Sequence, residues 1–341
     1  MARETERLRV ERAQLTALLT EIPLAMILLN PAGEIVLYDG QAADVLSRVA
    51  PPRLKAPLSD YFDPLALDDA ITRMKRGERE ATFVLSDHTG AQSFDAYLKP
   101  LDGDCALLVI DVETEHAPAP RPLVFDFDLL SRVETPEIRQ ARLRDLCFVV
   151  FDTETTGLSI EEDDVIQIGA VRVLNGRIVE GETLDRLVNP GRPIPPVSTR
   201  IHKISDLDVA DAPDLGVVAR EFHNFARDSV LVAHNAPFDI GLLRKSEADV
   251  GVEWTHPVVD TVLLSAVVFG TNEVHSLDAL CRRLSIDLPE ERRHTALGDA
   301  EATATVLVKL LPLVEAKGLC TFGDLVEEMQ KHGRLLTDLN H

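Results

Sequence analysis

The pattern of polar and apolar positions changes along the chain and predicts five successive segments. Residues 1–22 are rich in charge, lack Gly and Pro, and place apolar residues seven positions apart at Met1, Leu8, Leu15 and Ile22. This spacing predicts a helix with a narrow apolar seam, as in a short two-stranded coiled coil. A lone amphipathic helix packed on its own domain explains the pattern equally well, since three heptads are near the minimum for a coiled coil.

Residues 23–112 have the pattern of a small α+β domain. A buried strand at 25–29, a turn at 30–33 and a returning strand at 34–38 come first. Helical stretches and strand-like runs follow at 41–49, 64–76, 81–85, 92–98 and 105–112. Two strands, short helices and three more strands, with an Asn-Pro-Ala-Gly turn near the start, resemble a PAS domain. The resemblance implies a regulatory or dimerising role.

Residues 113–145 have the composition of a linker. The stretch 115–122 is rich in proline and is expected to be extended. A short helix is expected at 139–144, where it would lead into the next domain. At the other end of the chain, residues 321–341 are expected to form a tail with one amphipathic helix over 322–336.

Residues 146–320 alternate between strand and helix patterns, which predicts a mixed sheet with helices packed on it. The strongest local signal is a hairpin of strands 165–174 and 177–188 across Asn175-Gly176, a sequence typical of a type I′ turn. Other strands are expected at 147–152, 230–233 and 258–259. Helices are expected at 214–227, from 237 onward, at 276–284 and at 295–311.

Two carboxylates stand at the end of the first strand of this domain, in Phe-Asp-Thr-Glu-Thr-Thr-Gly-Leu at 151–158. Asp152 and Glu154 are two residues apart, so both side chains lie on one face of a strand, about 7 Å apart. Two like charges on a buried strand are costly unless something neutralises them. Because Mg²⁺ and Mn²⁺ prefer oxygen ligands, the pair predicts half of a metal site.

Two further acids lie at predicted helix starts. Asp239 follows the strand at 230–233, and Asp299 opens the last long helix, five residues after His294. Each acid alone is explained by the favourable placement of a carboxylate near a helix start. The combination of four acids and a histidine in this order indicates a single centre.

In order and spacing, these residues resemble the three motifs of the DEDDh 3′→5′ exonucleases, the family of the epsilon proofreading subunit of bacterial DNA polymerase III. The resemblance extends over 146–311 and includes Ile201-His202-x-Ile204. It implies a ribonuclease H-like mixed sheet flanked by helices. The variant of the superfamily that uses tyrosine instead of histidine is excluded, because all three tyrosines precede this domain.

The resemblance also implies a division of roles. Four acids would bind two divalent ions, Mg²⁺ or Mn²⁺, and a histidine would take the proton of the attacking water. The catalytic residues implied are Asp152, Glu154, Asp239, Asp299 and His294. The substrate contacts implied are Thr155, Thr156, Leu158, His202, His234, Asn235 and Phe238. His202 and His234 are equally well explained as structural residues, and Asp260 either supports the metal ligands or caps a strand end.

Composition limits the function classes. The formal net charge of −22 argues against a protein that coats nucleic acid, but not against an enzyme that acts on chain ends with bound metal ions. The longest apolar run, 23–29, is too short to cross a membrane. Four scattered cysteines, Cys105, Cys147, Cys281 and Cys320, are typical of small core residues in a reducing cytoplasm.

The sequence therefore predicts a cytoplasmic, metal-dependent 3′→5′ exonuclease with a PAS-like domain. Its expected partners are 3′ ends of nucleic acid, with single-stranded DNA favoured over RNA, and a second copy bound through the first helix and the PAS-like domain. One alternative is an enzyme that trims RNA ends or oligoribonucleotides. Another is a signalling scaffold that binds nucleic acid without cutting it. A role in repair is favoured over proofreading, because 316–341 contains no recognisable clamp-binding segment.

Overall fold

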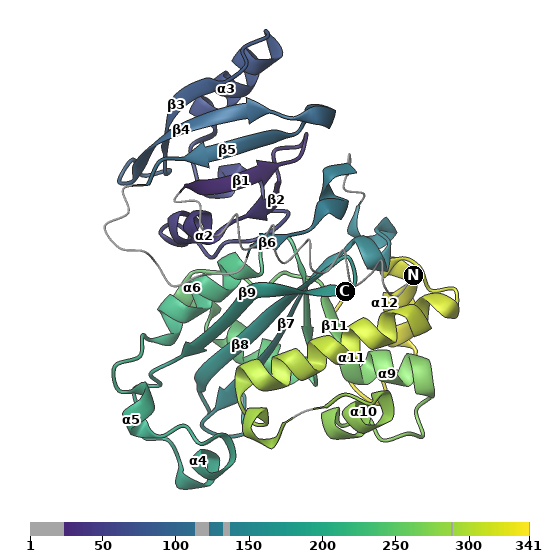
Figure 1. Ribbon diagram of the computed structural model, residues 1–341. Helices are drawn as coiled ribbons and strands as arrows, with labels where there is room; N and C mark the ends of the chain where they lie inside the picture. The colour runs from purple at the N-terminus through teal and green to yellow at the C-terminus, as the bar shows by residue number, and fades with distance from the viewer. Residues whose placement is uncertain (1–23, 113–122, 132–136, 288, 341) are drawn as a thin grey trace. The chain divides into compact units, whose positions relative to one another are not determined.

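The computed structural model describes residues 24–112, 123–131, 137–287 and 289–340. The chain divides into two compact units, Met1–Glu134 and Thr135–His341 (Figure 1). The predicted helix at 1–22 lies outside the described residues, so the coiled coil stays a prediction.

The first unit is built on a six-stranded antiparallel sheet with the order β3-β4-β5-β1-β2-β6. Its strands are β1 (Ala25–Leu29), β2 (Ile35–Tyr38), β3 (Ala81–Ser86), β4 (Ser93–Pro100), β5 (Ala106–Ile110) and β6 (Val124–Phe125). Helices α2 (Gly40–Ser47) and α3 (Pro64–Lys75) and the 3₁₀-helix η1 (Leu58–Asp60) lie between β2 and β3 in the chain, and η2 (Asp102–Asp104) precedes β5. Asp39 and Asp63 cap the two α-helices by accepting backbone N–H groups of the first turn.

The predicted linker contains more structure than expected. β6 pairs with β2 and is followed by η3 (Phe127–Ser131), η4 (Ile138–Gln140) and η5 (Leu143–Asp145). In place of the single short helix expected at 139–144, the structure has two separate 3₁₀ turns, η4 and η5. Between η4 and η5, Arg142 forms an antiparallel bridge with Thr321, and this pairing requires extended backbone.

The second unit contains a five-stranded sheet with the order β11-β10-β7-β8-β9. β7, β8 and β9 are antiparallel, whereas β10 and β11 run parallel to β7. The strands are β7 (Cys147–Thr155), β8 (Val165–Leu174), β9 (Arg177–Leu187), β10 (Val230–Ala233) and β11 (Val258–Asp260). The longer helices are α6 (Leu215–Phe225), α7 (Ala236–Lys245), α9 (Thr261–Phe269), α11 (Ala296–Ala316) and α12 (Phe322–Gln330). Shorter ones are α4 (Pro196–His202), α5 (Asp206–Val209), α8 (Glu247–Val250), α10 (Leu277–Leu284) and η6 (Glu290–Arg292).

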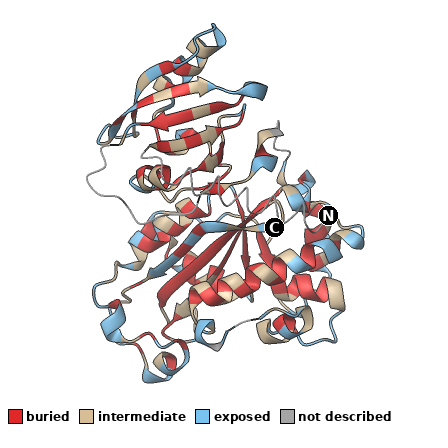
Figure 2. Cartoon of the chain, in the orientation of Figure 1, coloured by how far each residue is buried: buried red, intermediate tan, exposed pale blue. Residues whose placement is uncertain are grey.

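Helices cover both faces of this sheet. Phe148 and Val150 of β7 belong to a core cluster with α9, α11 and α12, whereas Val149 and Phe151 belong to a second cluster with α6 and α7. Figure 2 shows the central strands as almost continuously buried. A strand that is buried on both faces carries a continuous apolar run instead of alternating polar and apolar residues. This explains the unbroken apolar run at 147–151, directly before Asp152. The predicted mixed sheet flanked by helices is confirmed.

Local predictions in this unit held at turns and failed at some helices. Asn175 and Gly176 both have positive φ (50° and 69°), as a type I′ hairpin requires. The sequence prediction missed α9, because its residues are apolar and buried on nearly every side and show no helical stripe. Helix α12 ends at Gln330, earlier than expected. Residues 331–333 donate their N–H groups to the carbonyl three residues earlier, as in a 3₁₀ turn, instead of continuing the α-helix.

The carboxyl-terminal segment reaches the open edge of the sheet. The side-chain oxygen of Asn340 accepts a hydrogen bond from Val258 N–H (2.9 Å), and its amide donates to Val258 O (2.7 Å). β11, which contains Val258, is an edge strand. One side chain therefore pairs with both backbone groups of one residue on that edge.

Three of the four cysteines are buried, as expected, but Cys320 is exposed, so the prediction of a core position was wrong there. Cys320 stands in the turn before α12, where its backbone, not its thiol, is used: Cys320 O accepts a hydrogen bond from Leu143 N–H. Among the described residues, none of the helices has the length and apolar character that a membrane span requires.

Candidate active site

Strand β7, which carries Asp152 and Glu154, continues beyond Asp152, where the sequence predicted its end. β7 runs to Thr155, and β8 pairs with it so that Asp152 faces Gly169 and Glu154 faces Gln167. The prediction that the strand ends at Asp152 was therefore wrong. Because both carboxylates belong to a paired strand, the backbone ladder fixes their positions.

The first turn of α11 lies directly against β8. An ideal Cβ on Gly169 would lie 2.1 Å from the backbone of Ala296 and Leu297, so only glycine permits this contact. Gln167 holds the same helix start, because its side-chain oxygen accepts a hydrogen bond from Ala296 N–H (3.2 Å). This close approach brings Asp299 to the motif strand.

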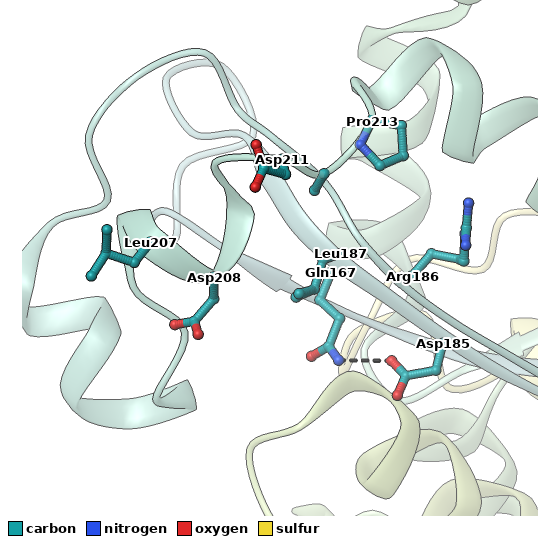
Figure 3. Close-up of a pocket in the computed structure, with 9 residues that line it drawn as sticks. Gln167, Asp185, Arg186, Leu187, Leu207, Asp208, Asp211 and Pro213 are labelled. Carbon is teal, nitrogen blue, oxygen red and sulfur yellow. Dashed lines mark hydrogen bonds between the residues drawn. The ribbon is translucent and has the colours of Figure 1, made fainter.

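Gln167 was not recognised from the sequence. Its amide also donates to Asp185 Oδ1 (2.7 Å), and both residues line an open surface pocket (Figure 3). Gln167 therefore links β8, β9 and the start of α11. The signal that could have found it is its register opposite Glu154, which is known only once the strands are paired.

The structure brings the four predicted acids together. One carboxylate oxygen from each of Asp152, Glu154 and Asp299 lies within 4.8 Å of the others. Asp239 joins them from α7 and is only 4% exposed. Its Oδ1 accepts hydrogen bonds from Thr153 N–H (3.2 Å) and from the Thr153 hydroxyl (2.6 Å). β7, α7 and α11 thus converge on one acidic cluster.

Burial and mutual repulsion oppose ionisation in this cluster. Burial, followed by the charges of Asp299 and Asp239, raises the pKa of Glu154 to about 8. Burial raises the pKa of Asp239 to about 7, although hydrogen bonds from Thr153 partly counteract it. Burial and then the three neighbouring acids raise the pKa of Asp152 well above its ordinary value. Burial also raises the pKa of Asp299, against a lowering by His294.

These residues fit divalent metal ions. The donor set consists of carboxylate oxygens, which Mg²⁺ and Mn²⁺ prefer. In this cluster, burial outweighs the lowering of the Asp299 pKa by His294 and Arg293, and a bound cation would favour the ionised form of the acids.

His294 occupies a different environment. It is exposed, has a left-handed backbone (φ 57°), and its N–H donates to Asp299 Oδ2 (3.2 Å). Neighbouring ion pairs tie its loop to the helices, Arg293 with Asp278 (2.6 Å) and Arg292 with Glu301 (2.6 Å). His294 therefore lies at the rim of the acidic cluster, next to one of its members.

Asp260 joins two helix starts. Its Oδ2 accepts a hydrogen bond from Ala236 N–H (2.6 Å) at the start of α7, and its Oδ1 accepts one from Val262 N–H (2.7 Å) in α9. Burial raises its pKa to about 6. Asp260 therefore stands at the end of β11 and also holds the start of α7, the helix that carries Asp239. These contacts agree with both roles considered from the sequence, a strand-end cap and a support for the acidic cluster.

Three of the expected substrate contacts point into the protein. The Thr155 hydroxyl donates to Gly157 O (2.5 Å), and the Thr156 hydroxyl and N–H donate to Asp163 Oδ1 and Asp164 O. His202 is buried, and its Nδ1 accepts a hydrogen bond from Ile204 N–H (3.1 Å). Both threonine hydroxyls are used within the chain, which favours a structural role for Thr155 and Thr156. His202 Nδ1 is used in the same way, whereas its buried Nε2 has no hydrogen-bond partner among the described residues.

The other expected contacts differ in exposure. Leu158 is 90% exposed and Asn235 is exposed in a left-handed conformation (φ 69°), whereas Phe238 is half-buried against the core. His234 Nδ1 bonds the Thr261 hydroxyl (2.8 Å). Burial, then the nearby His275, lowers the pKa of His234 to about 4, so this imidazole is neutral at pH 7.

Comparison with known proteins agrees with this geometry. Residues 149–307 match the model of the RNase_T family, described as Exonuclease. This part of the chain is similar to exonuclease domains. The match includes all four acids and His294.

Related proteins extend the comparison. The chain is 56% identical to the DNA polymerase III subunit epsilon-like protein of Rhodobacter capsulatus over 221 residues, which are 64% of this chain and 31% of that protein. It is 30% identical to the PolC-type DNA polymerase III of Bacillus subtilis over 278 residues, 81% of this chain and 18% of that protein. The chain thus spans less than a third of the length of these relatives.

Among solved structures, exonuclease X in complex with 5′ overhanging duplex DNA is 28% identical. The similarity covers 53% of this chain and 99% of that chain, with a TM-score of 0.43. E. coli exonuclease I in complex with a dT13 oligonucleotide is 18% identical, with a TM-score of 0.45 over 51% of this chain and 42% of that chain.

Proposed function

We propose that the second unit is a metal-dependent 3′→5′ exonuclease that removes nucleotides from DNA ends. The observation that carries the proposal is the convergence of Asp152, Glu154 and Asp299 within 4.8 Å, inside a domain that matches an exonuclease family. Asp239 completes the set from α7. The DNA polymerase names of the relatives favour DNA over RNA as the substrate.

The residues have separable tasks in this reaction. The four acids would hold two divalent ions, Mg²⁺ or Mn²⁺, which when bound supply positive charge to the reacting phosphate. His294, exposed beside the cluster, takes the proton of the attacking water and exchanges it with solvent. Attack at phosphorus breaks the bond to the 3′ oxygen of the preceding nucleotide, which leaves a new 3′ hydroxyl and a nucleoside monophosphate. Leu158 projects far enough to contact the terminal base.

A regulatory or dimerising role is proposed for the first unit, as a PAS-like domain. The order β3-β4-β5-β1-β2, with α2 and α3 between β2 and β3, supports this proposal. A homodimer would form through this unit and residues 1–22. Light scattering on a chain lacking residues 1–22 tests the helix, and an unchanged mass would remove it as the dimer contact.

A cytoplasmic location is proposed as well, supported by four cysteines that are all free thiols.

The decisive experiment follows release of a labelled 3′-terminal nucleotide from single-stranded DNA, duplex DNA and RNA. Release is expected with Mg²⁺ or Mn²⁺ and not with a chelator, and fastest on single-stranded DNA. Preferred release from short RNA would favour the RNA-trimming alternative. Binding without release on every substrate would instead favour the scaffold.

A further inference from the structure

The loop 156–164 after the motif strand is closed by its own hydrogen bonds. Asp163 Oδ1 accepts a hydrogen bond from the Thr156 hydroxyl (2.9 Å), and its Oδ2 accepts one from Ser159 N–H (2.9 Å). An ideal Cβ on Gly157 would lie 2.4 Å from Asp163 Oδ2, so a side chain there would have to displace the Asp163 carboxylate. The loop is therefore folded tightly around one carboxylate.

Arg192, in the segment between β9 and α4, joins both ends of this loop. Its Nη2 donates to the Thr156 hydroxyl (2.7 Å) and to Glu162 O (2.7 Å), and its Nε pairs with Asp164 Oδ2 (2.6 Å). One planar guanidinium thus contacts the start and the end of the loop in a fixed geometry that a lysine ammonium cannot reproduce.

Two further contacts connect the loop to helices of the domain. Lys245, at the end of α7, donates from its Nζ to Asp163 O (2.8 Å). Ser198, in α4, donates from its hydroxyl to Thr156 O (2.7 Å). Because α7 also carries Asp239, the loop and the acidic cluster share a common support.

Leu158 is the outermost side chain of the loop. It is 90% exposed, whereas the other loop groups described above bond within the protein. The side chains of Arg192 and Asp164 are 42% and 37% exposed, and ion pairs of this kind contribute little to stability. The contacts of Arg192 therefore determine loop geometry more than the free energy of unfolding.

We propose that Arg192 is a positioning residue that fixes loop 156–164 and so presents Leu158 to the base of the 3′-terminal nucleotide. The domain then prefers an end that carries a base over an abasic end, since only a base offers an apolar face to Leu158. This inference rests on the proposed exonuclease function.

The test measures kcat and KM for release from two oligonucleotides that differ only in whether the 3′-terminal nucleotide carries a base. Arg192→Gln is expected to lower kcat/KM about tenfold on the base-carrying end, mainly through KM, and to leave the abasic end nearly unchanged. Leu158→Ala is expected to give the same pattern, and the double variant to lose no more than either single one. Arg192→Lys is expected to stay impaired.

Arg186→Gln is the matched control, because Arg186 forms a similarly exposed ion pair with Glu221 (2.8 Å) elsewhere on the domain. It should change neither substrate. Equal losses on both ends, additive losses in the double variant, or a wild type that does not distinguish the two ends would overturn the role of Arg192. A wild type that releases nothing from either end would instead overturn the proposed function.

Discussion

The acidic cluster and its rim are built in opposite ways. Asp152 and Glu154 stand on a paired strand, and Asp239 and Asp299 in the first turns of two helices. Leu158 and His294 stand on exposed loops that a few side-chain contacts hold. The comparison teaches that regular elements bring the carboxylates together, whereas the residues proposed for proton transfer and substrate contact stand on loops. Variants of the two regions should therefore fail in different ways.

The largest effect is expected in the cluster. Asp152→Asn should reduce nucleotide release about 1,000-fold or more, because a central acidic ligand is lost. The same change should raise Tm without metal, since folding then no longer requires this buried carboxyl to take up a proton. Release assays and thermal denaturation measure both. Asp211→Asn, an exposed acid outside the cluster, is the control. Activity of the Asp152→Asn variant above a tenth of wild type would show that Asp152 is not part of the catalytic site.

A smaller loss is expected at the rim. His294→Gln should lower kcat about 100-fold, because a general base typically contributes that much. The increase in Tm caused by Mn²⁺ should remain as in wild type, because the acids are untouched. His88→Gln, at an exposed histidine of the first unit, serves as control. Loss of the Mn²⁺ effect would show that rim and cluster are not separable.

A variant of Asp260 tests whether this residue, which holds the start of α7, supports the acidic cluster. Asp260→Asn loses one acceptor at a helix start, so a loss of about 1 kcal/mol in stability and about tenfold in rate is expected. Asp214→Asn is the matched control, because Asp214 caps α6 by accepting from Val217 N–H (3.0 Å). The control should lose similar stability and no rate. Equal rate losses in both would mean that Asp260 acts through stability alone.

A further prediction, which needs no change of sequence, is a pH dependence of stability. Burial raises the pKa of Glu154 from 4.5 to about 8 and that of Asp239 from 3.8 to about 7. Between these values the folded protein without metal binds more protons than the unfolded chain, so the free energy of unfolding falls as pH rises from about 5 to about 8. At about 1.36 kcal/mol per pKa unit, the two shifts together correspond to a decrease on the order of 5 kcal/mol over this pH range.

Bound Mg²⁺ or Mn²⁺ should counteract this loss of stability at higher pH. Mg²⁺ or Mn²⁺ in large excess should add roughly 2–3 kcal/mol of stability. The gain should be greater at pH 8 than at pH 6, because bound cations need ionised carboxylates. Denaturant titrations at the two pH values, with metal and with chelator, provide the measurement. A metal effect independent of pH would contradict the raised pKa values.

The cluster could be predicted from sequence because its chemistry is local to short motifs. Asp152 and Glu154 share a face by strand geometry alone, and Asp239 and Asp299 are marked by helix-start patterns. Turn chemistry was equally local, as Asn175 and Gly176 show. These features depend on neighbours in the chain, not on distant segments.

Features set by tertiary contact were missed. Gln167 acquires its role from Ala296, and Arg192 from Thr156, each far away in sequence. Helix α9 is surrounded by core on nearly every side, so no polar stripe revealed it. The inward turn of His202 likewise follows from packing that no motif records.

Asn340 gives the sheet a further property. An open strand edge presents unpaired N–H and C=O groups on which an extended peptide of another molecule can add itself. The Asn340 amide imitates one residue of such a neighbouring strand, because it satisfies the donor and the acceptor of Val258 together. One side chain thus occupies the two backbone groups of Val258 that an added strand would need at this position.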